Sequence, residues 1–322
     1  MIIASIRPTI SFARRSFTST RTQHRNETSA LFLNASRLDY DQQLDFSSWH
    51  SICQNVILNR VDAIRDSDEM LQLLHQHQPT IVLAKEMTIP TTVVEQFPSS
   101  VQLICEAGTG YNNWPIAVAR SKRIPVCNVP TYSTDAVAHM AITYLMNFAV
   151  SMFDQQRMLL NNDRSNFTGP FTLPLHEVGH QTLGLVGGAG RIGTKVAEIA
   201  LALGMKKVII SSRQPTLPEG HSLYNHPNVE CTTDVNYLLR HSDYVSLHTP
   251  LNDQTRRSFG RQQIEQMKPT AFLINTSRGG VCHEEELIQC LEERVIQAAG
   301  LDVTTTEPPP PDSKLWQLPN RI

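Results

Sequence analysis

A glycine-rich turn is the first feature of the sequence whose spacing points to chemistry. Gly188, Gly190 and Gly193 form a GxGxxG pattern that follows the apolar run TLGLVGG and precedes a stretch with helical periodicity. Such glycines allow a tight turn and a close approach of the backbone to a pyrophosphate, which then lies at the positive end of a helix. We therefore expect a dinucleotide site formed by Gly188, Gly190, Arg191, Ile192 and Gly193. A glycine turn without a ligand is the alternative, and the additional Gly187 leaves the register of the turn open.

The next apolar run, KKVIISSR, ends in residues that could select the cofactor. An Asp or Glu at this point would bind the 2'-hydroxyl of NAD, but the sequence has Ser211, Ser212 and Arg213. Without a carboxylate there, a 2'-phosphate can accept hydrogen bonds from the serines and a charge-assisted contact from Arg213. The pattern favours NADP over NAD. A solvated Arg213 with a loose choice of cofactor is the alternative.

These residues need strands that deliver them to one edge of a sheet. Two series of apolar runs alternate with helical patterns, the first within residues 31–113 and the second within residues 182–303. Such alternation predicts an α/β fold with parallel sheets, in which ligands bind at the carboxyl ends of the strands. We expect two Rossmann-like domains: a flavodoxin-like substrate domain at residues 31–130 and a dinucleotide-binding domain at residues 131–308. Residues 309–322 are expected to form a hinge.

A long apolar segment separates the two series. It begins with Ser133, Thr134 and Asp135 as candidate caps and continues with apolar residues at helical spacing. The pattern predicts one long helix with more than one apolar face, buried between domains or in a subunit interface. We therefore expect a homodimer that forms through a helix from Ser133 to about Met158.

Composition limits the classes of partner. A chain of 322 residues with 40% hydrophobic and 18% charged residues is long enough for two cores. Its net charge of -2 gives no attraction to nucleic acid, and no apolar run reaches the roughly 20 residues that a membrane span needs. The six cysteines have no metal-like spacing, which favours buried reduced thiols in a reducing compartment. A small molecule is the expected partner.

The first 26 residues differ from the rest of the chain. They hold five arginines, many Ser and Thr, and no acidic residue before Glu27. This composition is typical of a mitochondrial or plastid transit peptide, so we expect residues 1–30 to direct the protein to such an organelle. A disordered basic tail without an address is the alternative, and the protein is then cytoplasmic.

Six segments together resemble one enzyme family. They read CEAGTGYNN, PTYSTDAVAHMAI, GGAGRIG, VSLHTPL, MKPTAFLINTSRGG and GLDVTTTEPPP, and their order and approximate spacing are those of the D-isomer-specific 2-hydroxyacid dehydrogenases. The resemblance runs from about Leu31 to the last residue. It implies hydride transfer between NAD(P)H and a small 2-oxo acid or D-2-hydroxy acid. The segment CEAGTGYNN and the NADP-type strand end favour glyoxylate or hydroxypyruvate.

The resemblance also implies roles for individual residues. Arg278 is expected to bind the carboxylate of the 2-oxo acid and to polarise its carbonyl, and Glu307 to raise the pKa of a catalytic His. Asp302 is expected to meet the nicotinamide carboxamide. Further expectations are cofactor contacts from Thr249, Thr276 and Ser277, binding of the substrate carboxylate by the backbone of Gly108, Thr109 and Gly110, and Lys85 as an additional candidate.

One part of the family's pattern is not matched. The family's general acid is a His beyond the segment that reads SKLWQLPNRI here, and its final helix returns to the substrate domain after that point. We expect both to be absent from a chain cut short at Ile322, and His283, the last histidine, to cap a helix or to be solvated. Two hypotheses follow: a truncated 2-oxo acid reductase, and a catalytically impaired cofactor-binding protein or regulatory dimer subunit.

Overall fold

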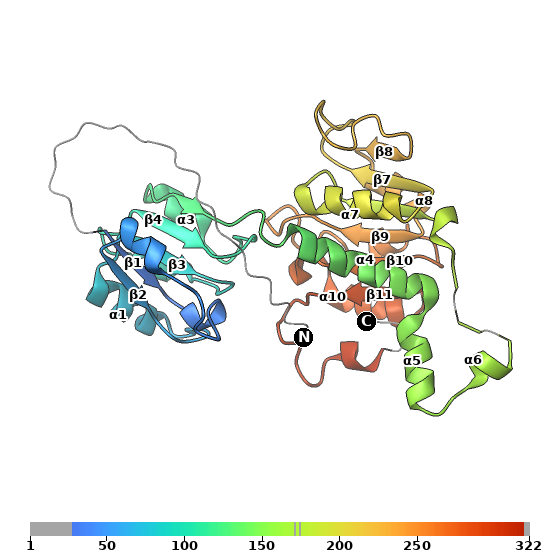
Figure 1. The fold of residues 1–322 in the computed structure, drawn as a ribbon, viewed down its shortest axis with the longest axis horizontal. Coiled ribbons are helices and arrows are strands. Elements are labelled where there is room, and N and C mark those ends of the chain that lie inside the picture. Colours follow the sequence, from blue (N-terminus) through green and yellow to red (C-terminus); the bar gives the residue numbers. More distant parts are fainter. Residues whose placement is uncertain (1–27, 171, 174, 319–322) are drawn as a thin grey trace. The chain divides into compact units, whose positions relative to one another are not determined.

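The chain forms two compact units, Met1–Tyr132 and Ser133–Ile322, each with one sheet (Figure 1). The computed structural model describes residues 28–170, 172–173 and 175–318. Residues 1–27 of the expected transit peptide, which spans residues 1–30, therefore lie outside the described residues. Residue 28 leads directly into the first strand.

The sheet of the first unit has five parallel strands. They are β1 (Ser29–Phe32), β2 (Asn55–Leu58), β3 (Ile81–Ala84), β4 (Leu103–Glu106) and β5 (Val126–Cys127). Their order is β2-β1-β3-β4-β5, and every neighbouring pair is parallel. This is the order of the flavodoxin-like fold, so the expectation for this unit is confirmed.

Both faces of this sheet are covered, which explains why its strands read as continuous apolar runs. Leu31 packs in one cluster with residues of α1 (Ser67–His77), α2 (Thr91–Glu95) and α3 (Ile116–Ser121). Phe32, the next residue, packs on the opposite face near the short helices η1 (Ala35–Arg37) and η2 (Ser47–Ser51). The side chain of Asp66 caps α1 by accepting a hydrogen bond from the Asp68 amide at 2.9 Å.

The sheet of the second unit has six parallel strands. They are β6 (Thr182–Val186), β7 (Lys207–Ser211), β8 (Val229–Thr232), β9 (Tyr244–Leu247), β10 (Phe272–Asn275) and β11 (Ala298–Leu301). Their order, β11-β10-β9-β6-β7-β8, is that of the doubly wound dinucleotide-binding fold. The chain order reverses between β6 and β9, and ligands bind at the carboxyl ends of strands at such a switch point. The expected Rossmann-type sheet is confirmed.

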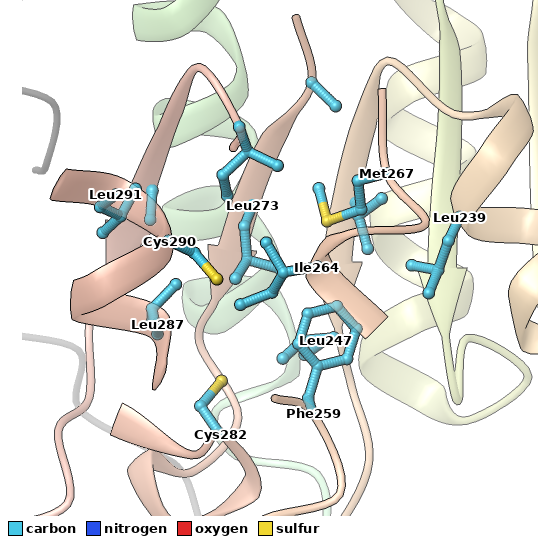
Figure 2. Packing of buried hydrophobic residues seen from close by; sticks show 14 of the residues in the cluster. Leu239, Leu247, Phe259, Ile264, Met267, Leu273, Cys282, Leu287, Cys290 and Leu291 are labelled. Atoms are coloured by element: carbon cyan, nitrogen blue, oxygen red, sulfur yellow. The ribbon is translucent and has the colours of Figure 1, made fainter. Parts of the chain in front are cut away.

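The described helices of the second unit lie on both faces of its sheet or, where they bury no residue, beyond it. They are α4 (Thr134–Val150), α5 (Met152–Leu160), α6 (Ser165–Thr168), α7 (Arg191–Ala202), α8 (Val235–His241), α9 (Arg261–Ile264) and α10 (Glu284–Glu292), with the short helices η3 (Val178–His180), η4 (Gly279–Val281) and η5 (Lys314–Gln317). On one face, α4 and α7 pack on the sheet through residues such as Tyr144 and Val196. On the other, Leu239 of α8, Ile264 of α9 and Leu291 of α10 meet the strands (Figure 2).

The expectation of a single helix from Ser133 to about Met158 is wrong, because the helix breaks at Ser151. Ser151 has a left-handed backbone with a φ of 47°, and the axes of α4 and α5 differ by 65°. The side chain of Asn147 stabilises the break by accepting a hydrogen bond from the Phe153 amide at 2.8 Å. In the described part of the chain, no single helix is long and apolar enough to cross a membrane.

The break divides the apolar surface between two helices. α4 buries residues such as Ala141, Tyr144 and Leu145 within its own unit, against α7 and β10. α5 has no buried residue and exposes Met152 and Leu160, with 57% and 76% of their surface accessible. Exposed apolar side chains therefore lie on α5, whereas the exposed residues of α4 are polar.

Candidate functional site

The turn between β6 and α7 leaves no room for side chains at three of its glycines, among them Gly188, whose Cβ would lie 2.4 Å from the Cβ of Leu185. An ideal Cβ on Gly193 would lie 2.5 Å from the Cα of Gly188, so the helix packs directly on the turn. Gly187 has a φ of +73°, and its Cβ would lie 2.7 Å from the side chain of Thr249. A Cβ on Gly190 would instead meet only the Gly187 carbonyl, at 4.0 Å. The register is therefore 188-190-193, with open space beside Gly190 at the N-terminus of α7.

The end of β7 presents one free cation. Ser211 is buried, and the Ser212 hydroxyl closes a local turn by donating to the Gln214 carbonyl at 2.6 Å and accepting from its amide at 3.1 Å. Arg213 is exposed, and no acidic group of the described residues lies within ion-pair distance of it. Among the three residues expected to read a 2'-phosphate, Arg213 is thus the one whose side chain remains available.

The end of β9 carries a histidine that was not singled out from the sequence. The amide of His248 donates to the Val186 carbonyl at 2.8 Å, which joins this segment to the end of β6 beside the glycine turn. Its Nε2 is buried and has no hydrogen-bond partner among the described residues. Burial lowers the pKa of His248 to about 4, so the imidazole is neutral at pH 7. The sequence signals are its place in the segment VSLHTPL and its position directly after a buried strand and before Thr249.

The end of β10 holds Arg278 through a buried asparagine. The Asn275 side chain accepts hydrogen bonds from the amide and hydroxyl of Ser277, at 3.1 and 2.7 Å, and donates to the Arg278 carbonyl at 3.1 Å. The half-buried Arg278 guanidinium donates to the Ser277 carbonyl at 2.8 Å. Thr276 is buried, and its hydroxyl lacks a partner within the structure's described range. Asn275 was not singled out from the sequence, although it opens the segment NTSRGG.

The end of β11 brings Asp302 to the same edge. Its amide donates to the Asn275 carbonyl at 3.0 Å, and partial desolvation raises the pKa of its carboxyl group. Glu307 is exposed and accepts a hydrogen bond from the Thr304 amide at 3.2 Å. No histidine in the part of the chain that is described forms a hydrogen bond with Glu307. The described residues therefore do not include an imidazole in contact with Glu307, which is expected to orient one.

His283 belongs to a surface network rather than to this edge. It is the N-cap residue of α10, where its carbonyl accepts the Leu287 amide at 2.9 Å. Its ring lies 2.6 Å from a guanidinium nitrogen of Arg257 and 3.4 Å from the Glu286 carboxylate. The position expected for it at a helix start is confirmed.

In the first unit, the loop after β4 offers backbone donors. The Gly108 carbonyl accepts the Val129 amide at 3.0 Å, and the Thr109 carbonyl accepts the Asn128 side chain at 2.7 Å. The amides of Gly108 and Gly110 have no hydrogen-bond partner among the residues that are described. Two free amides in one short loop can bind a carboxylate, which is the role expected of residues 108–110.

A buried carboxylate supports this loop. Glu106 is 1% exposed and accepts hydrogen bonds from the Glu86 amide and the Trp114 indole, both at 2.9 Å. Its Oε1 would lie 2.9 Å from a Cβ on Gly108, so it packs directly under the loop. Burial raises the pKa of Glu106, although both hydrogen bonds and the charge of Lys85 oppose the shift. The sequence did not single out this residue.

Lys85, at the end of β3, is a fixed cation near the same loop. Its ammonium group lies 3.1 Å from the Glu86 carboxylate and 3.3 Å from the Tyr132 hydroxyl. Burial lowers its pKa, but the Glu86 and Tyr132 charges and hydrogen bonds outweigh burial, so the pKa is raised overall. Lys85 therefore stays protonated at neutral pH, which suits an electrostatic contact with an anionic substrate better than a role as a base.

The residues present at this edge fit a dinucleotide. The open space beside Gly190 and the helix N-terminus suit a pyrophosphate, and the unpartnered Thr276 hydroxyl and His248 nitrogen offer polar contacts. No group of three or more His, Cys, Asp or Glu side chains within the described ranges could hold a metal ion.

Comparisons with known proteins agree with this geometry. Residues 142–322 match the family described as "D-isomer specific 2-hydroxyacid dehydrogenase, NAD binding domain". The chain is 29% identical to a hydroxypyruvate reductase of Blautia hydrogenotrophica, over 87% of this chain and 84% of that protein. It is 32% identical to a glyoxylate reductase of Korarchaeum cryptofilum, over 81% of this chain and 73% of that protein.

A solved structure with the same fold is an acyclic imino acid reductase in complex with NADPH and D-arginine. It is 25% identical to this chain, with a TM-score of 0.76 over 92% of this chain and 88% of that one. The family match covers more than half of the chain, and the glyoxylate reductase exceeds 30% identity over most of its length. The chain therefore belongs to the D-isomer-specific 2-hydroxyacid dehydrogenases, the enzymes that transfer hydride between NAD(P)H and 2-oxo acids.

Proposed function

We propose that this chain is an NADPH-dependent reductase of small 2-oxo acids, with glyoxylate and hydroxypyruvate as the favoured substrates. The observation that carries the proposal is the Asn275-ordered turn, which holds Arg278 at the same sheet edge as the glycine turn. β9 alone separates β10 from β6, so the two strands lie about 10 Å apart. A dinucleotide bound at the glycine turn is long enough to bring its nicotinamide to Arg278.

The proposed chemistry uses few residues of this chain. NADPH supplies the hydride when it is bound. Arg278 pairs its planar guanidinium with the substrate carboxylate and stabilises the negative charge that develops on the carbonyl oxygen during reduction. Asp302 contacts the carboxamide and fixes the face of the nicotinamide. Glu307 would raise the pKa of a proton-donating histidine placed beside it, because a nearby carboxylate has this effect; no histidine of the described residues bonds to it.

The loop of residues 108–110 is proposed to receive the substrate carboxylate through its free amides. Lys85, which remains charged, adds electrostatic attraction to the same anion. The relatives whose names specify hydroxypyruvate and glyoxylate support these small acids over larger ones.

The choice of NADPH rests on Arg213. This residue is an exposed cation at the position where an acidic residue would bind the ribose hydroxyls of NAD. An imino acid reductase of the same fold in complex with NADPH supports the proposal.

Steady-state kinetics on the purified chain test the function. Glyoxylate and hydroxypyruvate should oxidise NADPH with a higher kcat/KM than pyruvate does, and NADH should be a poorer donor. Tight NADPH binding without reduction of any of the three acids would favour a cofactor-binding regulatory protein instead.

We also propose that the protein is a homodimer that associates through α5 rather than through the single long helix expected from the sequence. The exposed Met152 and Leu160 form the apolar surface that supports this proposal. Light scattering should give twice the chain mass, and Leu160→Asp should give the monomer. A monodisperse wild-type monomer at micromolar concentration would contradict the proposal.

Residues 1–30 are proposed to direct the protein to the mitochondrial or plastid matrix. The support is their arginine-rich composition without acidic residues before Glu27. A fluorescent protein fused to residues 1–30 should enter an organelle, and replacement of Arg14 and Arg15 by Glu should leave it in the cytosol. Cytosolic fluorescence of the unaltered fusion would refute the proposal.

A further inference from the structure

Three cysteines gather on one face of the first unit's sheet. Cys105 of β4 and Cys127 of β5 are directly paired across the two parallel strands. Cys53 follows η2 and packs in the same cluster as Cys105. All three are free thiols in this structure.

The pairing places Cys105 and Cys127 at a distance that a disulfide can span. Neighbouring strands lie about 4.8 Å apart, and directly paired residues project their side chains from the same face. Disulfide-linked cysteines have Cα atoms about 4.4–6.8 Å apart and Cβ atoms about 3.8 Å apart. β5 contains only Val126 and Cys127 and lies at the edge of the sheet, so a short displacement can close the remaining gap.

The thiols differ in their access to solvent. Cys127 is exposed and lines a groove of about 450 Å³ together with Arg120 and Arg123, whereas Cys105 is half-buried and Cys53 is 2% exposed. Burial raises the pKa of the Cys105 thiol to about 12, with smaller contributions from Cys127 and Cys53. A dissolved oxidant therefore reaches Cys127 first, and Cys105 is the thiol paired with it across the strands; its raised pKa keeps Cys105 protonated until the second step.

We propose that Cys105 and Cys127 are a reversible oxidation site that forms a disulfide in the presence of a hydroperoxide. The Cys127 thiol ionises, its thiolate attacks the terminal peroxide oxygen, and the O–O bond breaks to give a sulfenic acid; the alkoxide or hydroxide that leaves takes up the proton released by Cys127 and becomes an alcohol or water. The Cys105 sulfur then attacks the Cys127 sulfur, and the S–O bond breaks. The hydroxide that leaves takes the Cys105 proton and becomes water, so two thiols are oxidised and one peroxide is reduced.

The bond would act on the loop that we propose for substrate binding, and this part of the inference rests on the proposed function. Asn128, next to Cys127, donates to the Thr109 carbonyl at 2.7 Å, and the Val129 amide donates to the Gly108 carbonyl at 3.0 Å. Movement of β5 towards β4 shifts both donors and with them the loop. We expect the KM for the 2-oxo acid to rise by at least about threefold, because displacements of about 1 Å are costly in an active site.

Peptide mapping of the full chain tests the disulfide itself. Trypsin places Cys53, Cys105 and Cys127 in three different peptides, residues 38–60, 86–120 and 124–157. After treatment with hydrogen peroxide, wild type and the matched control Cys53→Ser should contain a cross-link between residues 86–120 and 124–157 that dithiothreitol removes. Cys127→Ser should lack it. A cross-link to residues 38–60, or a sulfinic acid on Cys127 without a cross-link, would overturn the proposal.

Kinetics on the same samples test the effect on the loop. The KM for glyoxylate should rise in oxidised wild type and oxidised Cys53→Ser, return after reduction, and stay constant in Cys127→Ser, while the NADPH Kd does not change. A complete cross-link with an unchanged KM would refute the effect on the loop. A chain that cross-links but reduces no 2-oxo acid would contradict the proposed function and leave the disulfide assigned.

Discussion

Different groups hold the functional segments in place at the carboxyl ends of the two sheets. In the second unit the backbone forms the nucleotide turn, because Gly193 and Gly188 pack with no space for a side chain. In the first unit a buried side chain supports the loop, since Glu106 accepts hydrogen bonds from the Glu86 amide and the Trp114 indole beneath Gly108. The comparison teaches that the turn should tolerate almost no substitution at Gly188 or Gly193, whereas the loop above Glu106 should respond to charge and pH.

Gly193→Ala should have the largest effect, because it disturbs the glycine turn between β6 and α7. Its Cβ would lie 2.5 Å from the Gly188 Cα, so α7 must move away from the turn. We expect NADPH affinity to fall by at least about 100-fold, as a misplacement of about 1 Å suffices for a loss of that size. Fluorescence titration measures the affinity. Gly179→Ala is the matched control, because its Cβ would meet the nearest atom, the Gly204 carbonyl oxygen, at 3.6 Å. Unchanged NADPH binding by Gly193→Ala would place the pyrophosphate elsewhere.

Arg278→Lys should separate substrate binding from cofactor binding at the same edge. Lysine keeps the positive charge but loses the planar pair of donors. We expect kcat/KM for glyoxylate to fall by about 100-fold, the usual loss when one donor to a developing oxyanion is removed. The NADPH Kd should stay constant, and Arg240→Lys, at the exposed end of α8, should change neither value. A larger effect on NADPH than on glyoxylate would assign Arg278 to the cofactor.

The same contrast explains what the sequence could and could not predict. Glycine spacing and apolar runs indicated both sheets and the turn, because these features depend on local backbone geometry. Asn275 and Glu106 were missed because their importance arises from the distant backbone groups that they contact. The helix break at Ser151 was missed because neither Gly nor Pro marks it and apolar residues continue on both sides.

The cofactor contacts illustrate the same limit. Ser212 was expected to hydrogen-bond a phosphate, yet its hydroxyl closes a turn with Gln214. A sequence shows that a hydroxyl is present but not which backbone group competes for it. The unpartnered Nε2 of His248 likewise depends on how β6 and β9 pack together.

Glu106→Gln should test whether this side chain supports the loop of residues 108–110. An amide can accept from one of the two donors, but its NH₂ group then faces the other. We expect the KM for glyoxylate to rise several-fold and the unfolding free energy at pH 7 to change by about 1 kcal/mol, with NADPH affinity unaffected. Glu95→Gln, which alters an exposed carboxylate of α2, is the matched control. A KM equal to that of wild type would remove Glu106 from the support of the loop.

The pH dependence of the unfolding free energy tests the raised pKa of Glu106. Its pKa in the folded chain is raised above the ordinary value of 4.5, chiefly by burial. The group therefore stabilises the fold below pH 4.5, and this contribution is lost as pH rises through the raised value. Wild type should gain stability relative to Glu106→Gln as pH falls from 7 towards 4.5, as measured by urea unfolding. Parallel pH profiles for the two proteins would contradict the raised pKa.

Arg213→Ala should have the smallest effect, because Arg213 is exposed and its contact with a 2'-phosphate is screened by water and salt. A charge-assisted hydrogen bond at such a site still favours NADPH, and we expect its loss to weaken NADPH binding by about twofold, or about 0.4 kcal/mol. NADH binding should not change, since NADH has no 2'-phosphate. Raising the salt concentration should narrow the difference between wild type and variant, because the interaction is ionic. Arg240→Ala removes an exposed cation from the end of α8 in the same unit and should leave both affinities as they are. An equal loss of NADH and NADPH affinity in Arg213→Ala would mean that Arg213 supports the β7 turn rather than reading the phosphate, and cofactor choice would then have to come from other residues.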